Sequence, residues 1–360
     1  MAEVRLDLVT KRFGRHAAVD ELSLTAADGE FFVLLGPTGA GKTTTLRLIA
    51  GLERPDSGAI QIAGEDARDW SVAERDVALV FQYYSLYPRY TVRQNLAFPL
   101  KSRVHSYAPA EIEQRIARAA KMLRIEHLLE RKTDKLSGGE MQRVSIGRAI
   151  VREPRIFLMD EPLSNLDAKL REALRAELKD LQMSLKATFL FVTHDQIEAM
   201  SMGDKVGVLN EGRLIQVGTP NQIYNEPRDT FVAAFVGSPA MNLLPIEVAD
   251  GRIVVPGAFD HPLDDAGRRR LATGSGAVTL GIRSEDIAVG PGGAAAARVH
   301  HIENHGVEKI VTLRAGESLF KATVPAIAPI AVEDTVRFSF NQNKLHGFDP
   351  ASGRNRVAPG

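Results

Sequence analysis

The sequence of 360 residues contains no cysteine, which excludes disulfide bonds and fits a reducing compartment. It also lacks any run of the roughly 18 to 20 apolar residues that a membrane-spanning helix needs. Lys and Arg number 45, as do Asp and Glu, so no net charge favours a nucleic acid or an acidic membrane surface. Met1–Arg5 do not have the basic and then apolar layout of a signal peptide. We expect a cytoplasmic protein that acts at a membrane only through partners.

The chain is long for one compact core, and its patterns predict two domains, at residues 1–235 and 236–360. In the first, apolar runs alternate with helical patterns, which predicts an α/β fold with a parallel sheet and crossover helices. Strands are expected at 31–35, 77–82, 156–160, 189–193 and 206–209, and helices at 109–123, 142–151 and 168–185. Residues 4–24 read as antiparallel strands that turn at Gly14. A helical insertion is expected at about residues 88–150.

The sequence pattern of the second domain differs from that of the first. Glycine and proline become frequent, and short runs of alternating apolar and polar residues replace the helical patterns. These runs lie at 278–289, 309–313, 319–324 and 335–340. They are typical of a small β-barrel. Residues 290–297 are expected to form a surface loop, and residues 256–276 give no confident prediction.

A phosphate-binding pattern, G-x-x-x-x-G-K-[ST], is present as Gly36-Pro37-Thr38-Gly39-Ala40-Gly41-Lys42-Thr43. An apolar strand pattern precedes this loop and a helical pattern follows it. The loop is therefore expected to open into a helix N-terminus, where free N–H groups favour phosphate. Lys42 is expected to reach the β- and γ-phosphates of a nucleotide, and the Thr43 hydroxyl to bind Mg²⁺. A glycine-rich turn that arose by chance is the alternative, and the strand–loop–helix context disfavours it.

Polar residues follow three other predicted strands, at the edge where a parallel sheet places its ligands. Beside a phosphate loop, Asp160 is suited to hold Mg²⁺ through water, and Glu161 to accept a proton from the water that attacks the γ-phosphate. A solvated Asp-Glu-Pro turn is the alternative. His194 and Gln82 lie at equivalent places. Alone they carry little weight, since a strand-end histidine usually bonds only to neighbouring backbone.

A second glycine turn, Ser137-Gly138-Gly139, lies within the predicted insertion. It is of a kind that contacts nucleotide from across a subunit interface. Together with the phosphate loop it indicates an ATP-driven motor whose active site needs two copies of the domain.

In this order, the motifs resemble those of ATP-binding cassette ATPases, and more narrowly the ATP-binding subunits of bacterial sugar importers of the maltose and glycerol-phosphate type. The resemblance covers essentially the whole chain and implies binding of ATP and Mg²⁺. It gives the phosphate loop the residues Gly36, Pro37, Thr38, Gly39, Ala40, Gly41, Lys42, Thr43 and Thr44.

The resemblance also implies roles for single residues outside that loop. Phe13 matches the aromatic residue that stacks on adenine, and Gln82 the glutamine that touches metal and water and links the nucleotide to the permease contact. His194 matches the switch histidine at the γ-phosphate. Further matches are Ser137, Gly138 and Gly139 in the signature loop, Asp160 as metal organiser, Glu161 as base, and Asp167 in the interface loop 164–167.

The narrower resemblance rests on the segments 81–88, 236–242, 280–283 and 345–349. Two positions depart from the family pattern. Glu140 stands where the signature most often has Gln, a frequent variant that should not impair catalysis. Ser284 replaces the usual Pro after Ile282 and Arg283, which affects the detail of an OB-like barrel rather than its presence.

Several partners are implied by the resemblance: a second copy of the chain, two transmembrane permease subunits, and an extracytoplasmic solute-binding protein that touches the permeases. No nucleic acid is expected. The chain would lie on the cytoplasmic face of the cell membrane as a peripheral subunit that energises uptake of a sugar, polyol or glycerol phosphate. The alternative is the ATPase of a polyamine, iron or sulfate importer. The C-terminal barrel carries no catalytic constellation, and the resemblance implies dimer contact and regulation there.

Overall fold

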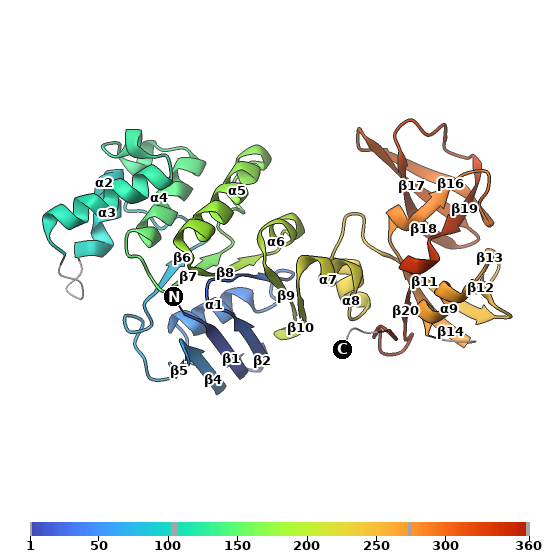
Figure 1. Cartoon of the computed structure of the whole chain (residues 1–360), viewed down its shortest axis with the longest axis horizontal. Helices are drawn as coiled ribbons and strands as arrows, with labels where there is room; N and C mark the ends of the chain where they lie inside the picture. The colour runs from blue at the N-terminus through green and yellow to red at the C-terminus, as the bar shows by residue number, and fades with distance from the viewer. Residues whose placement is uncertain (1, 102–106, 273–275, 358–360) are drawn as a thin grey trace. The chain divides into compact units, whose positions relative to one another are not determined.

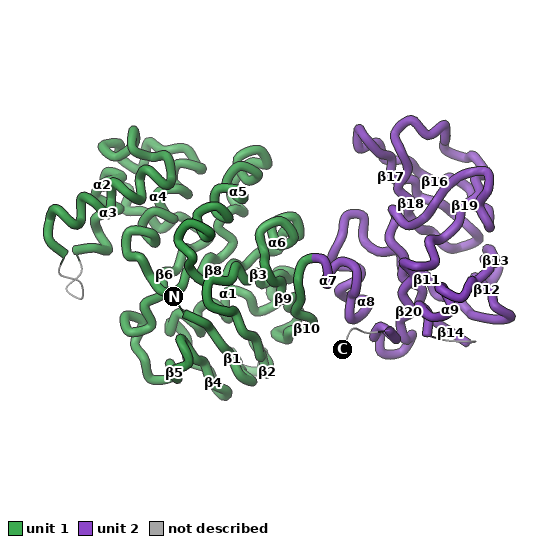
Figure 2. The backbone as a smooth tube through the Cα atoms, in the orientation of Figure 1, with its two compact units in different colours: residues 1–220 green, residues 221–360 purple. Residues whose placement is uncertain are grey.

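The computed structural model describes residues 2–101, 107–272 and 276–357; residues 102–106 of the predicted insertion lie outside them (Figure 1). The chain folds as two compact units, residues 1–220 and 221–360 (Figure 2). Two short helices, α7 (Pro220–Asn225) and α8 (Thr230–Phe235), lie between this division and the boundary that composition predicts after residue 235. Each unit has a hydrophobic core of its own.

The first unit is built on a six-stranded sheet in the order β10-β9-β3-β8-β7-β6. The strands are β3 (Phe31–Leu35), β6 (Val77–Val80), β7 (Ile156–Asp160), β8 (Thr188–Thr193), β9 (Lys205–Asn210) and β10 (Arg213–Gly218). All are parallel except β10, which pairs antiparallel with β9. Every residue of β3 is fully buried between two neighbouring strands, which explains its apolar sequence without alternation. The predicted parallel α/β core is confirmed.

A second, antiparallel sheet of the same unit has the order β2-β1-β4-β5. Its strands are β1 (Val4–Phe13), β2 (His16–Ala26), β4 (Ser57–Ile62) and β5 (Glu65–Asp66). The hairpin of β1 and β2 pairs Phe13 with His16 and turns at Gly14, as the sequence predicts. Gly14 has a φ of 60°, a left-handed conformation that glycine adopts without steric cost. Strands β4 and β5 were not predicted.

Helices connect the parallel strands and form the insertion. They are α1 (Lys42–Ala50), α2 (Val92–Ala97), α3 (Pro109–Met122), α4 (Gly138–Ile150), α5 (Ala168–Leu185) and α6 (Gln196–Met202). The helices α2, α3 and α4 contact one another and gather at one end of the unit, where the sequence predicts the insertion (Figure 1). No helix within residues 2–101, 107–272 and 276–357 is both long and apolar enough to cross a bilayer.

The second unit is β-rich, as predicted, and its strands form two five-stranded antiparallel sheets, β13-β12-β11-β14-β20 and β15-β19-β16-β17-β18. The elements are β11 (Asn242–Ala249), β12 (Arg252–Val255), β13 (Phe259–Pro262), α9 (Asp265–Leu271), β14 (Gly276–Ile282), β15 (Ile287–Val289), β16 (Ala295–Asn304), β17 (Glu308–Ala315), β18 (Ser318–Pro325), β19 (Thr335–Phe340) and β20 (His346–Phe348). One apolar core joins the two sheets. The surface loop expected at 290–297 is wrong at its end, because residues 295–297 begin β16 and pair with β19.

A buried arginine holds the two short helices of the second unit. Arg283 is 3% exposed and donates to the backbone carbonyls of Tyr224 at 2.8 Å, Ala233 at 3.4 Å, and Val236. Its guanidinium also lies 4.0 Å from the centroid of the Tyr224 ring. Burial lowers the pKa of Arg283. Carbonyl dipoles at the ends of α7 and α8 and an aromatic face offset part of this cost of burying the cation.

Candidate nucleotide site

The phosphate loop connects β3 to α1 and turns sharply between them. Gly39 and Gly41 have φ values of 82° and 100°, and Gly41 is the N-cap of α1 without a side-chain cap. A Cβ on Gly41 would lie 2.2 Å from the carbonyl oxygen of Ala18, whereas a Cβ on Gly39 would meet nothing within 4 Å. The first glycine is therefore open toward solvent and the second is packed against the hairpin. The N–H groups that begin α1 are left for a ligand, in an arrangement that suits phosphate.

Lys42 begins α1, and its side chain is held inside the loop. The side chain is 5% exposed, and Nζ donates to the carbonyl oxygens of Gly36 and Pro37, each at 2.9 Å. Nζ also lies 3.4 Å from Glu161 Oε1. The ammonium group is thus fixed between the loop and the carboxylate that follows β7.

Thr43 and Asp160 bring two oxygen donors together. Thr43 Oγ1 donates to Asp160 Oδ1 at 2.9 Å. Burial raises the pKa of the Asp160 carboxyl, and the hydrogen bond from Thr43 opposes that shift. A hydroxyl and a carboxylate at the end of a phosphate loop form a hard oxygen set, which fits Mg²⁺.

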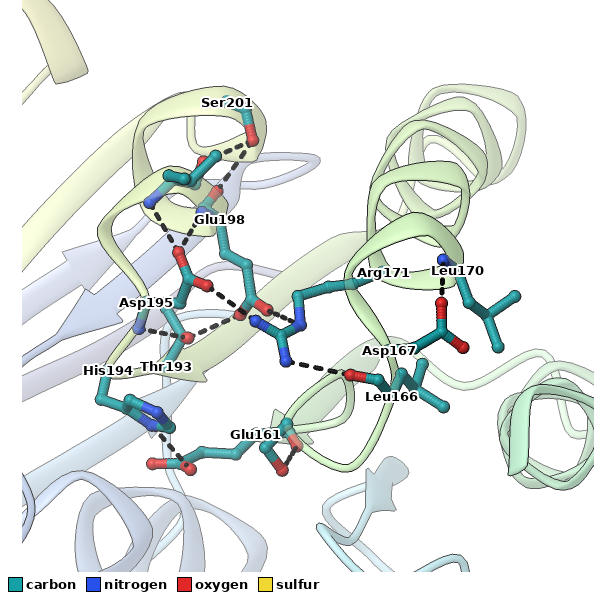
Figure 3. A network of polar contacts seen from close by, with 12 residues as sticks. Glu161, Leu166, Asp167, Leu170, Arg171, Thr193, His194, Asp195, Glu198 and Ser201 are labelled. Carbon is teal, nitrogen blue, oxygen red and sulfur yellow. Dashed lines mark hydrogen bonds and ion pairs between the residues drawn. The ribbon is translucent and has the colours of Figure 1, made fainter. Parts of the chain in front are cut away.

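The Glu161 carboxylate meets the residue that follows the adjacent strand β8. His194 Nδ1 lies 3.0 Å from Glu161 Oε2 (Figure 3). Glu161 has a φ of 45°, outside the regions that non-glycine residues usually occupy. Its backbone N–H donates to the carbonyl of Val192 at 3.0 Å, which ties this turn to β8. Such strain is maintained only where surrounding bonds over-determine the backbone, and it is common at functional sites.

Gln82 follows β6 and contacts the segment 164–167. Its Nε2 lies 3.4 Å from Ser164 Oγ, and its backbone oxygen accepts from Asn165 Nδ2 at 3.0 Å. Ser164 Oγ in turn donates to the backbone oxygen of Glu161 at 2.9 Å. Asp167 caps α5 by accepting from Leu170 N at 3.0 Å. Residues that follow three different strands therefore lie at one edge of the sheet.

The second glycine turn begins α4. Ser137 and Glu140 form a capping box, in which Ser137 N donates to Glu140 Oε2 at 2.7 Å and Ser137 Oγ lies 2.9 Å from the same oxygen. These bonds lower the pKa of Glu140. A Cβ on Gly138 would lie 3.2 Å from the Tyr84 hydroxyl. Among the described residues, no hydrogen bond or ion pair joins 137–139 to the phosphate loop, so one copy does not bring these two predicted loops together.

Phe13 lies at the tip of β1 and is 48% exposed. Lys11 Nζ lies 5.4 Å from the centroid of its ring. The hairpin reaches the phosphate loop through Gly212, because Asp20 N donates to Gly212 O at 2.9 Å and Gly212 N donates to Ala40 O at 3.0 Å. The hairpin that carries Phe13 is therefore joined to the phosphate loop through Gly212.

Three polar residues near this edge, Arg171, Asp195 and Glu198, were not predicted from the sequence. Asp195 caps α6, so a Thr-His-Asp stretch before a helix is a local signal that could have found it. Arg171 reads as an ordinary solvent-facing residue of α5, and only the tertiary structure shows its contacts. A cleft of about 140 Å³ between α4 and the segment after β6 was not predicted either. Its lining includes Phe81, Tyr84, Ser85, Pro99, Ser145 and Arg148.

Three family models match the chain: an ABC transporter model at residues 19–164, a MalK OB fold domain at 237–287 and a TOBE domain at 280–348. The trehalose/maltose import ATP-binding protein of Thermococcus litoralis is 46% identical, over 98% of this chain and 99% of its own length. The xylose/arabinose import ATP-binding protein of Haloferax volcanii is 45% identical, over 100% and 97%. The sn-glycerol-3-phosphate import ATP-binding protein of Rhizobium meliloti is 47% identical, over 98% and 100%.

Solved structures resemble the first part of the chain. A dimeric ATP-binding cassette in a post-hydrolysis state, bound to ADP and Pi, is 32% identical with a TM-score of 0.54, over 60% of this chain and 98% of that one. The cbiO1 protein of Clostridium perfringens, part of an ABC transporter complex, is 28% identical with a TM-score of 0.58, over 61% and 89%.

Proposed function

The chain belongs to the ABC transporter family of ATP-binding proteins, and we propose that it is the ATP-hydrolysing subunit of an importer for a carbohydrate-class solute. Relatives that match over essentially their whole length are named for import of trehalose and maltose, xylose and arabinose, or glycerol 3-phosphate. Those names support a sugar, polyol or glycerol phosphate over a polyamine, iron or sulfate. The observation that carries the ATPase proposal is the contact of Glu161 with both Lys42 and His194.

The phosphate groups of ATP would bind to the loop from Gly36 to Thr44. The open space at Gly39 and the free N-terminus of α1 support this placement. Thr43 and Asp160, with Gln82, would hold Mg²⁺ through oxygen atoms. When bound, that ion neutralises charge on the β- and γ-phosphate oxygens.

Glu161 is the proposed base, which accepts a proton from the attacking water. His194 orients the Glu161 carboxylate and, with Lys42, stabilises the charge that develops on the γ-phosphate. The distances of 3.0 Å and 3.4 Å to the two carboxylate oxygens support these roles. Phe13 is the proposed stacking partner of adenine, and its half-exposed ring on a hairpin that bonds through Gly212 to the phosphate loop supports that assignment.

Two copies are required in this proposal. ABC cassettes dimerise, and a solved cassette that this chain resembles is dimeric. Ser137, Gly138 and Gly139 of one copy would contact the γ-phosphate held by the other, while Asp167 lies at the shared interface. The separation of 137–139 from the phosphate loop within one copy supports this arrangement.

ABC cassettes also pair with permeases. The cleft lined by Phe81, Tyr84 and Arg148 is the proposed seat of a permease helix, next to Gln82 and the helical insertion. An extracytoplasmic solute-binding protein would contact the permeases and not this chain. The chain would act as a peripheral subunit at the cytoplasmic face of the membrane, and its second unit would serve dimer contact and regulation.

The decisive test compares the wild type with Glu161→Gln in the presence of Mg-ATP. We expect turnover to fall at least about 100-fold in the variant. We also expect ATP to remain bound in a particle of twice the monomer mass. Hydrolysis at the wild-type rate by a monomeric variant would remove Glu161 as the base and overturn the two-copy mechanism.

The solute class needs a separate measurement. In transporter reconstituted with its permeases and binding protein, a carbohydrate or a glycerol phosphate should stimulate ATP hydrolysis. Stimulation by spermidine, and by no carbohydrate, would contradict the substrate class and leave the ATPase proposal intact.

A further inference from the structure

Arg171 lies in the first turn of α5 and connects two segments of the site (Figure 3). Its Nη2 donates to the backbone oxygen of Leu166 at 3.0 Å, and its Nη1 donates to Asp195 Oδ2 at 3.3 Å. Its Nε makes no hydrogen bond to the described residues and lies 3.9 Å from Glu198 Oε1, within the distance of an ion pair. The three nitrogens of one guanidinium group therefore point to three different partners. A lysine could not reproduce this set, since it presents a single charged atom.

The two carboxylates are part of the structure that follows β8. Asp195 Oδ1 accepts from the first N–H groups of α6, of Ile197 at 2.7 Å and of Glu198 at 3.2 Å. Glu198 is 2% exposed and accepts from Thr193 Oγ1 at 2.6 Å. Burial raises the pKa of Glu198, and the charge of Arg171 is among the groups that oppose that shift. Arg171 is thus paired with groups whose positions are fixed by α6.

Two of the three partners of Arg171, Asp195 and Leu166, lie close in sequence to groups that contact Glu161. Asp195 follows His194, whose Nδ1 lies 3.0 Å from the Glu161 carboxylate. Leu166 belongs to the segment 164–167, in which Ser164 Oγ donates to the Glu161 backbone oxygen at 2.9 Å. These contacts form a closed ring. It runs from the Glu161 side chain through His194 and Asp195 to Arg171. From Arg171 it returns through Leu166 and Ser164 to the Glu161 backbone.

We propose that Arg171 is a positioning residue for ATP hydrolysis. It holds the segment 164–167 at a fixed distance from His194 and so keeps the histidine and Glu161 in the geometry for attack by water. This inference rests on the proposed function. It also extends it, because the segment 164–167 is proposed to face the second copy. Arg171 would then make the rate at one nucleotide site depend on the state of the other.

The first experiment is steady-state ATP hydrolysis by the full chain with Mg-ATP. We expect Arg171→Gln to lower kcat about 10- to 100-fold, with KM for ATP changed less than about threefold, because orientation is lost and nucleotide contacts are not. The Hill coefficient should fall toward 1. Arg171→Lys should stay at least about tenfold below wild type, since one ammonium cannot bridge three partners.

A matched control lies on the same helix. Lys179 forms an ion pair with Asp204 at 2.6 Å, away from the nucleotide edge. Lys179 is 25% exposed and Arg171 28%, so Lys179→Gln removes an α5 cation of similar exposure and should leave kcat within about twofold of wild type. An Arg171→Gln variant that loses no more activity than this control, or that raises KM at constant kcat, would overturn the inference.

Hydrogen exchange of the nucleotide-free protein gives a second measurement that does not depend on activity. Arg171→Gln should speed exchange in residues 162–168 and 193–199 together, and Lys179→Gln in neither. If Arg171→Gln speeds hydrogen exchange in α5 alone, Arg171 does not link these two segments. A wild type without ATPase activity would refute the proposed function, and the exchange result would still decide whether Arg171 joins the two segments.

Asp195→Asn completes the test, since asparagine still caps a helix but carries no charge. It should lower kcat like Arg171→Gln, and the double variant should be no slower than Arg171→Gln alone. If the losses in kcat of the two single variants multiply in the double variant, Arg171 does not act through Asp195. If Arg171→Gln fails to fold, Asp195→Asn decides the question by the same kcat criterion.

Discussion

His194 Nδ1 lies 3.0 Å from Glu161 Oε2, and the two residues follow the adjacent parallel strands β8 and β7. The other carboxylate oxygen lies 3.4 Å from Lys42 Nζ. Each oxygen of the proposed base therefore faces a different nitrogen, one from the histidine and one from the phosphate loop. The orientation of the carboxylate is set by groups that lie on two separate segments of the chain.

This relationship predicts the effect of His194→Ala. We expect kcat for ATP hydrolysis to fall about 100-fold, because the carboxylate loses its orienting partner and the γ-phosphate loses a nearby donor. Binding of a fluorescent ATP analogue should change less than about threefold. His301, which is exposed in the second unit, provides the control, and His301→Ala should hydrolyse ATP like wild type. Equal activity in both variants would exclude a role for His194.

Two glycines of the phosphate loop should respond differently to alanine. Both have positive φ, which costs an alanine about 1 kcal/mol. Only at Gly41 would the new Cβ also lie 2.2 Å from the backbone oxygen of Ala18. We therefore expect Gly41→Ala to destabilise the first unit by about 3 kcal/mol or more, and Gly39→Ala by about 1 kcal/mol. Urea unfolding measures both, and equal losses would contradict the clash.

Acid should destabilise the second unit through His346. This residue is 7% exposed, and burial, followed by the charges of Arg270, Arg283 and Lys344, lowers its pKa to about 4. In the unfolded chain the histidine binds a proton near pH 6.5. The contribution of neutral His346 to the free energy of unfolding is therefore fully present above pH 6.5 and is lost as the pH falls toward 4. The loss is about 3 kcal/mol at most.

Thermal unfolding between pH 7.5 and pH 4.5 checks this expectation. His261 acts in the same direction, because its pKa is lowered by burial and its Nε2 accepts from Phe340 N at 3.2 Å. In His346→Gln the dependence on pH should become shallower without vanishing. A variant with the same pH profile as the wild type would show that His346 is not the titrating group.

Arg283→Lys should destabilise the second unit by about 2 kcal/mol, since one ammonium cannot reach the carbonyls of both α7 and α8. The control is Arg298→Lys, where an ion pair with Glu333 has both side chains 62% exposed. That change should alter the free energy of unfolding by less than about 0.5 kcal/mol. A smaller loss at Arg283 than at Arg298 would refute the role of the buried guanidinium.

Prediction from the sequence was most successful for elements whose local hydrophobic pattern matches their burial in the fold. β3, β7 and β8 are continuous apolar runs because each is buried within a parallel sheet, and parallel pairing brings the residues after them to one edge. The family expected from the order of these motifs is confirmed by full-length relatives. The roles of the individual site residues stay predictions.

What the sequence did not predict depends on contacts between distant segments. The alanines at 295–297 have low strand propensity, yet β16 includes them because β19 pairs alongside. Residues 256–276 include the short β13 and α9, too brief to give a periodic pattern, and residues 273–275 lie outside the described structure. Arg171 was missed for the same reason, since its partners at Leu166 and Asp195 meet only in the fold.

Gly139 shows how a contact between distant segments limits the substitutions that this protein tolerates. A Cβ there would lie 2.3 Å from Leu170 Cδ2, so an alanine at 139 requires the Leu170 side chain in the first turn of α5 to shift. The residue that is tolerated at position 139 is therefore expected to depend on the residue at position 170. Smaller residues at position 170 should offset the loss of stability that Gly139→Ala causes. The variant Leu170→Ala should accommodate an alanine at 139 without displacing another side chain.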